Sequence, residues 1–348
     1  MAAQDAPSAS PPLPPTMRIW KYSTPAGGIE NNMRLVEEPL PTPSRNKHLV
    51  QVLAVGLNPV DFKPAEARIV RLPATPGLDF AGRIVVPAQN SPLTAGTLIF
   101  GAASFYNPMA GGALAEYITV PTDTVAPIPA GVSPLVAGGA PIAAVTAYQS
   151  LQPYIKKGSR VFLNGGSGGT GTYGIQIAKA LGAHVTVSCS AANAELCRSL
   201  GADEVLDYNA RPLLDQLRDA AAKSGFFDHV VDNVFSGPDL YFQAHTYTAP
   251  NAHFVEVAGA PSLKFGRFAL GGLLIPGFLG GGKRKFNVFT CLVRTEPLEQ
   301  IARWIAEGKI KPATDQIFPM EQAVEAFKRL KTGRAKGKVI VSVAPEGH

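Results

Sequence analysis

The chain has 348 residues, which is enough to bury a large core and to form two domains. Hydrophobic residues make up 46% and charged residues 17%, as in globular proteins, and no apolar run approaches the ~20 residues that cross a bilayer. The net charge of +6 favours anionic ligands such as phosphates, coenzyme A esters or acyl-carrier proteins. Because no Lys/Arg block has interleaved aromatic residues, we do not expect binding to nucleic acid.

The start of the chain and its cysteines bear on the compartment. Residues 1–16 are rich in Ala, Ser and Pro, contain Asp5 and lack arginine, which is typical of a disordered tail rather than of a signal or transit peptide. Cys189, Cys197 and Cys291 are an odd, scattered set without C-x-x-C spacing, which indicates a reducing compartment without disulfides. We expect a cytoplasmic protein and leave a mitochondrial location or association with a membrane surface open.

Short apolar segments separated by turns dominate the chain from Met17 to about residue 130. The expected strands are Arg18–Tyr22, Met33–Glu37, His48–Leu57, Leu98–Ala102 and Leu114–Val120. Strands spaced in this way predict a mainly β unit with a barrel-like sheet. We assign residues 17–135 to this unit.

Strands and helices alternate after Pro129. The expected strands are Val161–Leu163, His184–Val187, Glu204–Leu206, Asp228–Val231 and His253–Val257, with helices such as Ala192–Leu200 and Leu213–Lys223 between them. This alternation predicts an α/β fold with a parallel, doubly wound sheet over residues 136–295. Residues 296–345 return to a different unit, with helices Pro297–Glu307 and Glu321–Arg329 and strand Lys338–Val343.

The glycine-rich turn after the Val161–Leu163 strand is the most informative motif. Gly166, Gly168 and Gly171 fit the pattern G-x-G-x-x-G between a strand and a helix. Side chains at these positions would keep the backbone away from a pyrophosphate, and the start of the helix offers free N–H groups to it. The turn therefore predicts a dinucleotide-binding domain, with a flexible loop as the alternative.

Six motifs in a fixed order extend this prediction. They are GLNPVD at 56–61, PGLDFAG at 76–82, GALAEY at 112–117, SGGTGT at 167–172, GADEVLDY at 201–208 and GRAKGK at 333–338. On these motifs the chain resembles the medium-chain dehydrogenase/reductase superfamily, and within it the zinc-free quinone and enoyl reductases of the reticulon-4-interacting-protein-1-like and fungal zinc-type oxidoreductase branch. The resemblance implies a GroES-like β-barrel catalytic domain, interrupted in sequence by a Rossmann domain.

The same resemblance argues against a catalytic zinc ion. Zinc-dependent relatives have Cys where this chain has Asn58, His at Leu78, an acid at Asp79 and a later Cys near Ile142. Asp79 alone cannot hold zinc, and the six histidines show no ligand spacing. We therefore expect no metal.

The cofactor prediction is NADPH. Ser167, Gly168, Gly169, Thr170 and Gly171 form the predicted phosphate-binding turn. Enzymes that prefer NAD usually have an Asp or Glu after the second strand, and this chain has none there. Ser190 and Asn193 stand in this segment instead; they offer polar groups to a 2′-phosphate or, alternatively, cap the next helix. By resemblance, Tyr208, Val257 and the loop of Arg334, Ala335 and Lys336 also contact the cofactor.

The expected reaction is reduction of a C=C bond conjugated to a carbonyl, or of a quinone, by hydride transfer. Charge develops on the carbonyl oxygen and a proton is needed. By resemblance, the loop of Asn58, Asp61 and Lys63 lines the nicotinamide pocket. Asn58 can donate a hydrogen bond and Lys63 can bind the oxygen or a carrier phosphate; Asp61 can orient either residue or only cap a turn. Because Phe62 cannot give a proton, Tyr148 or solvent must.

The sequence leaves two questions open, the function within this family and the role of the stretch before residue 285. The alternatives to a general reductase of enones, quinones and enoyl thioesters are a stand-alone, trans-acting enoyl reductase of a polyketide pathway and a catalytically idle NADPH-binding regulatory protein. The apolar, glycine-rich stretch Phe268–Lys285 ends in a basic cluster. It is consistent with a lid over the substrate, a membrane-surface contact, a homodimer contact or plain loop packing.

Overall fold

The computed structural model describes residues 13–103, 112–257 and 262–344, without the side chain of Phe278. Most of the predicted disordered tail lies outside these residues. The first strand, β1 (Thr16–Tyr22), pairs antiparallel with β2 (Met33–Pro39) in a small sheet of its own. A short 3₁₀ helix, η1 (Ile29–Asn31), connects the two strands.

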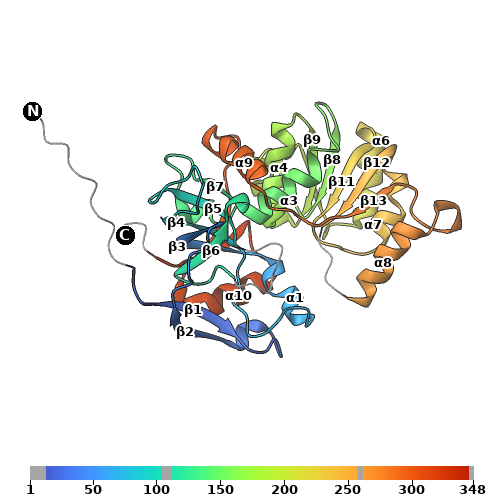
Figure 1. Ribbon diagram of the computed structural model, residues 1–348. Helices are drawn as coiled ribbons and strands as arrows, with labels where there is room; N and C mark the ends of the chain where they lie inside the picture. The colour runs from blue at the N-terminus through green and yellow to red at the C-terminus, as the bar shows by residue number, and fades with distance from the viewer. Residues whose placement is uncertain (1–12, 104–111, 258–261, 345–348) are drawn as a thin grey trace, which may run out of the picture.

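A seven-stranded sheet forms the barrel-like part (Figure 1). Its strands are β3 (Lys47–Leu57), β4 (Asp79–Val86), β5 (Leu98–Ala102), β6 (Tyr117–Pro121), β7 (Val125–Pro127), β14 (Thr314–Pro319) and β15 (Lys338–Ser342). The long strand β3 pairs antiparallel with β4, β6 and β15. Because β15 pairs with β3, the last part of the chain returns to the sheet formed by the first part.

Several short helices accompany this sheet. Two follow β3 directly, η2 (Pro59–Asp61) and α1 (Lys63–Glu66), so the predicted active-site loop starts where β3 ends. The later ones are η3 (Thr122–Thr124), α9 (Thr295–Ala306), η7 (Met320–Gln322) and α10 (Ala323–Lys331). In Figure 1 the red helices α9 and α10 lie on the same half of the molecule as the strands β1–β7.

The second half is a six-stranded parallel sheet with the order β10-β9-β8-β11-β12-β13. The strands are β8 (Arg160–Asn164), β9 (His184–Cys189), β10 (Glu204–Asp207), β11 (Phe227–Asp232), β12 (Thr248–Glu256) and β13 (Lys285–Val288). The strand order reverses between β8 and β11, where doubly wound sheets bind ligands at the carboxyl ends of their strands. The predicted α/β fold class, with a barrel-like sheet and a doubly wound parallel sheet, is confirmed.

Helices connect and cover the parallel strands. They are α4 (Gly169–Ala180), η4 (Ala191–Asn193), α5 (Ala194–Ser199), α6 (Leu213–Ser224), α7 (Asp239–Phe242), η5 (Ala244–Thr246), α8 (Leu263–Leu274) and η6 (Gly277–Leu279). Before β8, α2 (Pro134–Ala137) packs on the barrel strands β3, β4 and β5, and α3 (Pro141–Leu151) packs on α4, β4 and β5. Through α3, a continuous cluster of buried apolar side chains runs from Ala54 and Phe100 in the barrel to Val161 and Val185 in the parallel sheet. The two halves thus share one core at their junction.

The glycine-rich stretch before the basic cluster is only partly a loop. Residues 268–274 are the second half of α8, whose start is capped by Ser262, and the stretch ends at the edge strand β13. The expected strands missed β13, a four-residue edge strand in which only Phe286 is buried. The helix α8 was also missed, and its leucines are exposed, Leu263 by 89% and Leu274 by 72%. Hydrophobic periodicity marks buried faces, so it gives no clear signal in a segment whose leucines face solvent.

Candidate active site

Close packing explains the glycines in the turn between β8 and α4. Gly165 has a φ of +83°, a left-handed conformation that favours glycine. A Cβ at Gly171 would lie 2.1 Å from the carbonyl oxygen of Gly165, and one at Gly166 would lie 2.7 Å from Cβ of Val187. The helix α4 begins at Gly169, and its first N–H groups have no acceptor within the helix. The backbone of the turn is therefore open to a ligand at the start of α4, and its role in binding a pyrophosphate stays a prediction.

Buried polar side chains hold this turn from beneath. Ser188 Oγ accepts a hydrogen bond from the Gly165 N–H at 3.0 Å and donates one to Asn164 Oδ1 at 2.5 Å. Asn164 Nδ2 donates in turn to Asp232 Oδ1 at 2.8 Å. Burial raises the pKa of Asp232 at the end of β11. This network connects three neighbouring strands and fixes the backbone of the turn.

The residues predicted to meet a 2′-phosphate lie at one edge of the sheet. Asn193 Nδ2 donates to Ser167 Oγ at 3.1 Å, whereas Asn193 Oδ1 is buried without a partner in the described chain. Neither Ser190 nor Asn193 caps a helix through its side chain, so the capping alternative is wrong. Asp207 pairs with Cys189, which places Tyr208, 51% exposed, next to the start of this segment.

The loop near the C-terminus lies beside the same turn. Gly337 N–H donates to the Ser167 carbonyl at 3.1 Å, and Gly168 and Gly337 form a parallel bridge. The preceding residues expose the side chains of Arg334 and Lys336 and half-bury Ala335. On the other side, Val257 N–H donates to the Asp232 carbonyl at 2.9 Å. The structure thus brings Asn193 and the loop that ends at Gly337 to the glycine turn, and places Val257 beside Asp232 at the end of β11.

A buried cluster of charged and amide groups lies at the junction of the two halves. Asn58 Nδ2 donates to Asp79 Oδ2 at 2.8 Å and to the Gly56 carbonyl at 3.2 Å, so both amide hydrogens are used within the protein. The other carboxylate oxygen of Asp79 accepts the Ile142 N–H at 2.8 Å. The ammonium of Lys338 donates to Asn58 Oδ1, and lies 3.4 Å from Asp79 Oδ2.

Asp61 continues this cluster into the loop. Its Oδ2 accepts the Asn58 N–H at 2.7 Å, which is the turn-capping contact that the sequence allowed. Its Oδ1 is buried without a hydrogen-bond partner among the described residues. Burial raises the pKa of Asp61 to about 7, and the charge of Asp79 adds to this effect. Asp61 can therefore carry a proton near neutral pH.

Lys63 follows directly, at the start of α1. Its side chain is half-buried, and burial lowers the pKa of the ammonium. Within the described ranges, no carboxylate forms an ion pair with it, in contrast to Lys331, which contacts Glu30 and Glu66. A partly desolvated ammonium without a counter-charge is suited to an anionic oxygen.

Tyr148 is not part of this cluster. Its ring lies edge-on to Trp304 of α9, with ring centroids 5.7 Å apart. Burial and the charge of Glu296 raise the pKa of its phenol. Its charged neighbours are therefore on α9, whereas Asn58, Asp61 and Lys63 lie together.

Three residues near Asp79 were not expected from the sequence. Lys338 is 3% exposed, and the hydroxyl of Tyr173 is buried without a described hydrogen-bond partner. Burial raises the pKa of Tyr173, and burial raises that of the Cys291 thiol to about 12; the charge of Asp79 contributes to both shifts. Only Lys338 left a signal in the sequence, because a lysine that opens an apolar strand (Val339–Val341) requires a buried partner.

The residues at this junction do not fit a zinc ion. The resemblance places zinc ligands at Asn58, Leu78, Asp79 and near Ile142, and only Asp79 is a suitable donor. In the described parts of the chain, no group of three or more His, Cys, Asp or Glu residues is arranged to hold a metal. The positive charge beside Asp79 is instead the ammonium of Lys338.

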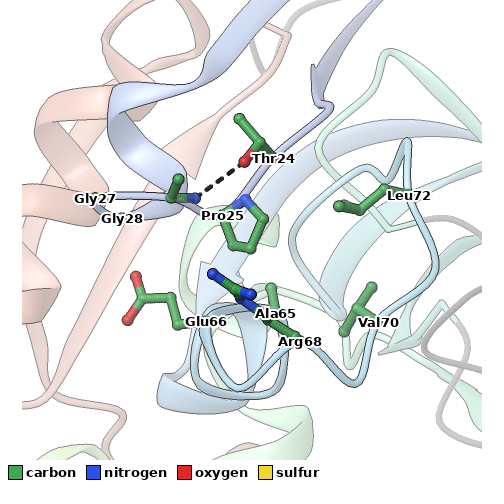
Figure 2. A pocket seen from close by; sticks show the side chains of 10 residues that line it. Thr24, Pro25, Gly27, Gly28, Ala65, Glu66, Arg68, Val70 and Leu72 are labelled. Atoms are coloured by element: carbon green, nitrogen blue, oxygen red, sulfur yellow. Dashed lines mark hydrogen bonds between the residues drawn. The ribbon is translucent and has the colours of Figure 1, made fainter.

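A separate pocket of about 450 Å³ lies beside α1 (Figure 2). It is lined by Thr24, Pro25, Ala26, Gly27, Gly28, Ala65, Glu66, Arg68, Val70 and Leu72. Figure 2 shows Glu66 and Arg68 opposite the loop of Thr24–Gly28, in which Thr24 Oγ1 accepts the Ala26 N–H at 3.2 Å. None of the predicted site residues lines this pocket, so we do not include it in the site.

Two family models match the chain. The model described as "Alcohol dehydrogenase GroES-like domain" matches residues 44–130, and the model described as "Zinc-binding dehydrogenase" matches residues 200–341. The first covers most of the barrel-like part, and the second covers the later strands of the parallel sheet and the return to the barrel. Among helices in the described residues, none is long and apolar enough to cross a membrane.

Individual proteins similar to this chain agree with the two family models. The chain is 44% identical to "Trans-enoyl reductase pgmF" of Aspergillus terreus, over 95% of this chain and 97% of that protein. It is 29% identical to "Chloroplast envelope quinone oxidoreductase homolog" of Arabidopsis thaliana, over 93% and 98%. The solved quinone oxidoreductase of Coxiella burnetii superposes with a TM-score of 0.79 at 26% identity, covering 94% of this chain and all of that one. The chain therefore belongs to the medium-chain dehydrogenase/reductase superfamily, as a nicotinamide-dependent oxidoreductase of its quinone and enoyl reductase type.

Proposed function

We propose that the protein is a metal-independent, NADPH-dependent reductase of C=C bonds conjugated to a carbonyl, and of quinones. The observation that carries this proposal is the contact between the glycine turn and the catalytic loop through Lys338. Its Cδ lies 3.2 Å from a Cβ built on Gly169, and its Nζ donates to the Leu57 carbonyl at 3.0 Å. A dinucleotide on the turn would therefore meet the loop that carries Asn58, Asp61 and Lys63.

The chain's own residues supply binding and electrostatics. We assign the pyrophosphate to Ser167, Gly168, Gly169, Thr170 and Gly171. When bound there, a reduced nicotinamide would supply a hydride to the β-carbon of the acceptor, which would leave negative charge on the acceptor's carbonyl oxygen. The unpaired ammonium of Lys63 stabilises that oxygen, at about 3–4 kcal/mol for a well-placed donor. Asp61 and Asn58 hold the loop, and solvent or Tyr148 provides the proton.

We propose NADPH rather than NADH because no carboxylate ends β9. Ser190 and Asn193 stand there, and Asn193 Nδ2 uses one of its two hydrogens on Ser167 Oγ, which leaves the other for a phosphate oxygen. Tyr208, Val257, Arg334, Ala335 and Lys336 complete the site in this proposal. The exposed Arg334 and Lys336 are the cations available to a 2′-phosphate.

Among conjugated acceptors, we favour an enoyl thioester. The support is the 44% identity to a protein named a trans-enoyl reductase, and it is also consistent with a stand-alone enoyl reductase of a polyketide pathway. A catalytically idle, NADPH-binding regulatory protein is the second candidate. It is disfavoured by Lys63, since a half-buried ammonium without a counter-charge has no evident role in a protein that only binds.

One panel of assays tests these proposals. NADPH oxidation is followed with a quinone, an alkenal, an enoyl-CoA and a plain ketone, each with and without a chelator. Turnover of the conjugated acceptors alone, unaffected by the chelator, is the expected result. Preference for the ketone, or loss of activity with the chelator, would overturn the mechanism. Binding of NADPH without any turnover would favour the idle protein.

We also propose the domain limits 17–135, 136–295 and 296–345, and a cytoplasmic location for the protein. The exposed leucines of α8 and the basic residues Lys283 and Lys285 form a surface suited to a second copy of the chain or to an anionic membrane. Light scattering and co-sedimentation with anionic vesicles distinguish these partners. If the protein is a monomer and does not bind the vesicles, the exposed leucines of α8 have neither role, and plain packing of this segment is the remaining explanation.

A further inference from the structure

The buried lysine at the start of β15 has all its hydrogen-bond donors occupied. Lys338 Nζ donates to the Leu57 carbonyl at 3.0 Å, to Asn58 Oδ1 and, at 3.4 Å, to Asp79 Oδ2. Its side chain is 4% exposed and that of Asp79 is fully buried. A buried ammonium is costly unless it is paired and hydrogen-bonded, and here it is both.

Lys338 also fixes the geometry of its partners. The amide oxygen of Asn58 accepts a hydrogen bond from Lys338, and its amide hydrogens are donated to Asp79 and to the Gly56 carbonyl. Lys338 therefore fixes the orientation of the Asn58 side-chain amide. The backbone N–H of Asn58, which precedes η2, donates to the carboxylate of Asp61, the last residue of η2. The ammonium therefore acts, through Asn58, on the loop that leads to Lys63.

The stem of the same side chain lies over Gly169 of the cofactor turn, in the space that a side chain at this position would need. The Cδ atom of Lys338 lies 3.2 Å from a Cβ built on Gly169, and the neighbouring Gly337 is hydrogen-bonded to the Ser167 carbonyl at 3.1 Å. One residue of β15 thus contacts the catalytic loop with its head and the dinucleotide turn with its stem.

The partners of the Lys338 ammonium indicate its role in the site. Asn58 and Asp79 stand at two of the four positions that the resemblance assigns to zinc ligands, and Asp79 Oδ1 accepts the N–H of Ile142, near the fourth. We infer that Lys338 is the internal cation of this active site and the residue that positions the Asn58–Lys63 loop against the dinucleotide turn. This inference extends the proposed function, and Lys338 is a positioning residue rather than a catalytic one.

Four variants test this role. Lys338→Met removes the charge and keeps the stem against Gly169. Asp79→Asn removes the partner charge, and the double variant removes both, so that neither member of the ion pair is left without the other. Lys309→Met is the matched control, because Lys309 is 55% exposed and pairs with Glu307 at the surface. The readouts are kcat and KM with an enoyl-CoA, the Kd for NADPH, the thermal midpoint, and amide hydrogen exchange of residues 58–67.

For Lys338→Met we expect kcat to fall more than tenfold, the Kd for NADPH to change less than threefold, and exchange in residues 58–67 to accelerate. The double variant should regain most of the thermal midpoint but not kcat. Unchanged kcat in Lys338→Met, or full recovery of kcat in the double variant, would overturn the inference, since the lysine would then only balance Asp79. The control variant should behave as the wild type.

Hydrogen exchange separates this inference from the proposed function. If the wild type reduces none of the acceptors, the proposed function fails, while faster exchange of residues 58–67 in Lys338→Met still supports the positioning role. Unchanged exchange in a variant that remains folded would overturn the role whatever the activity.

Discussion

Asn193 Nδ2 donates a hydrogen bond to Ser167 Oγ at 3.1 Å, and this contact joins the end of β9 to the glycine turn. The two residues are 26 positions apart in the chain, and the turn sequence alone does not reveal that they meet. The contact brings the residue that we assign to the 2′-phosphate next to the residues that we assign to the pyrophosphate.

The contact gives a direct test of cofactor preference. Asn193→Asp keeps the shape of the side chain and adds a negative charge beside Ser167. Two like charges about 4 Å apart repel by about 1–4 kcal/mol, depending on the local dielectric. We expect the Kd for NADPH to rise at least tenfold and the Kd for NADH to change less than threefold, as measured by titration calorimetry. Equal effects on both cofactors would contradict the assignment of the 2′-phosphate.

Gly171 should not tolerate a methyl group. In Gly171→Ala the new Cβ would lie 2.1 Å from the Gly165 carbonyl, so the turn must shift. Overpacking of this kind costs about 1–3 kcal/mol, and we expect a lower thermal midpoint together with weaker NADPH binding. Gly266→Ala is the control, because a Cβ there meets no atom within 4 Å. A variant at Gly171 that binds NADPH as well as the control would be inconsistent with the phosphate cradle.

Lys63 should affect turnover rather than cofactor binding. Lys63→Met removes the half-buried ammonium, and we expect kcat to fall by about 10²–10³, the effect of losing one donor to a developing oxyanion. The Kd for NADPH should stay within about threefold of the wild type, as measured by fluorescence titration. Lys309→Met, at an exposed ion pair, controls for loss of a surface charge. A rise in KM alone would indicate that Lys63 binds a carrier phosphate instead.

Asp61 makes stability depend on pH. Burial raises the pKa of Asp61 in the folded protein to about 7 from 3.8, so the folded state binds the proton more tightly than the unfolded state. This stabilisation is complete below about pH 3.8 and is lost as the pH rises to about 7. At 1.36 kcal/mol per pKa unit, the loss is about 4 kcal/mol at most. Asp79, Lys338 and Tyr22 are the ionisable groups that interact with it.

Thermal unfolding measures this effect. Between pH 5 and pH 8 we expect the midpoint of the wild type to fall, and the midpoint of Asp61→Asn to fall much less, because the amide cannot ionise. Asp219→Asn removes a carboxylate that is 65% exposed and serves as the control. Parallel pH curves for the wild type and Asp61→Asn would show that Asp61 titrates normally.

Local sequence determined the elements that have a regular hydrophobic pattern. The buried strands β8 and β9 and the glycine turn after Leu163 follow from apolar runs and from glycines that only a tight turn requires. The glycine turn could be assigned to a dinucleotide for the same reason, since its chemistry lies in consecutive residues. The helix α8 escaped prediction because its exposed leucines break the rule that apolar residues are buried. The edge strand β13 escaped because only one of its four residues, Phe286, is buried.

The tertiary structure decided which charged groups meet. Asn58, Asp79 and Lys338 are separated by 21 and 259 residues, and only the antiparallel pairing of β15 with β3, next to β4, brings them together. The sequence shows a lysine at the start of an apolar strand but not its partners. A buried ion pair depends on distances of a few ångströms between distant segments, and local patterns carry no information about such distances. The sequence therefore determined the fold and the cofactor turn, whereas the cation beside Asp79 depended on the packing of the two halves.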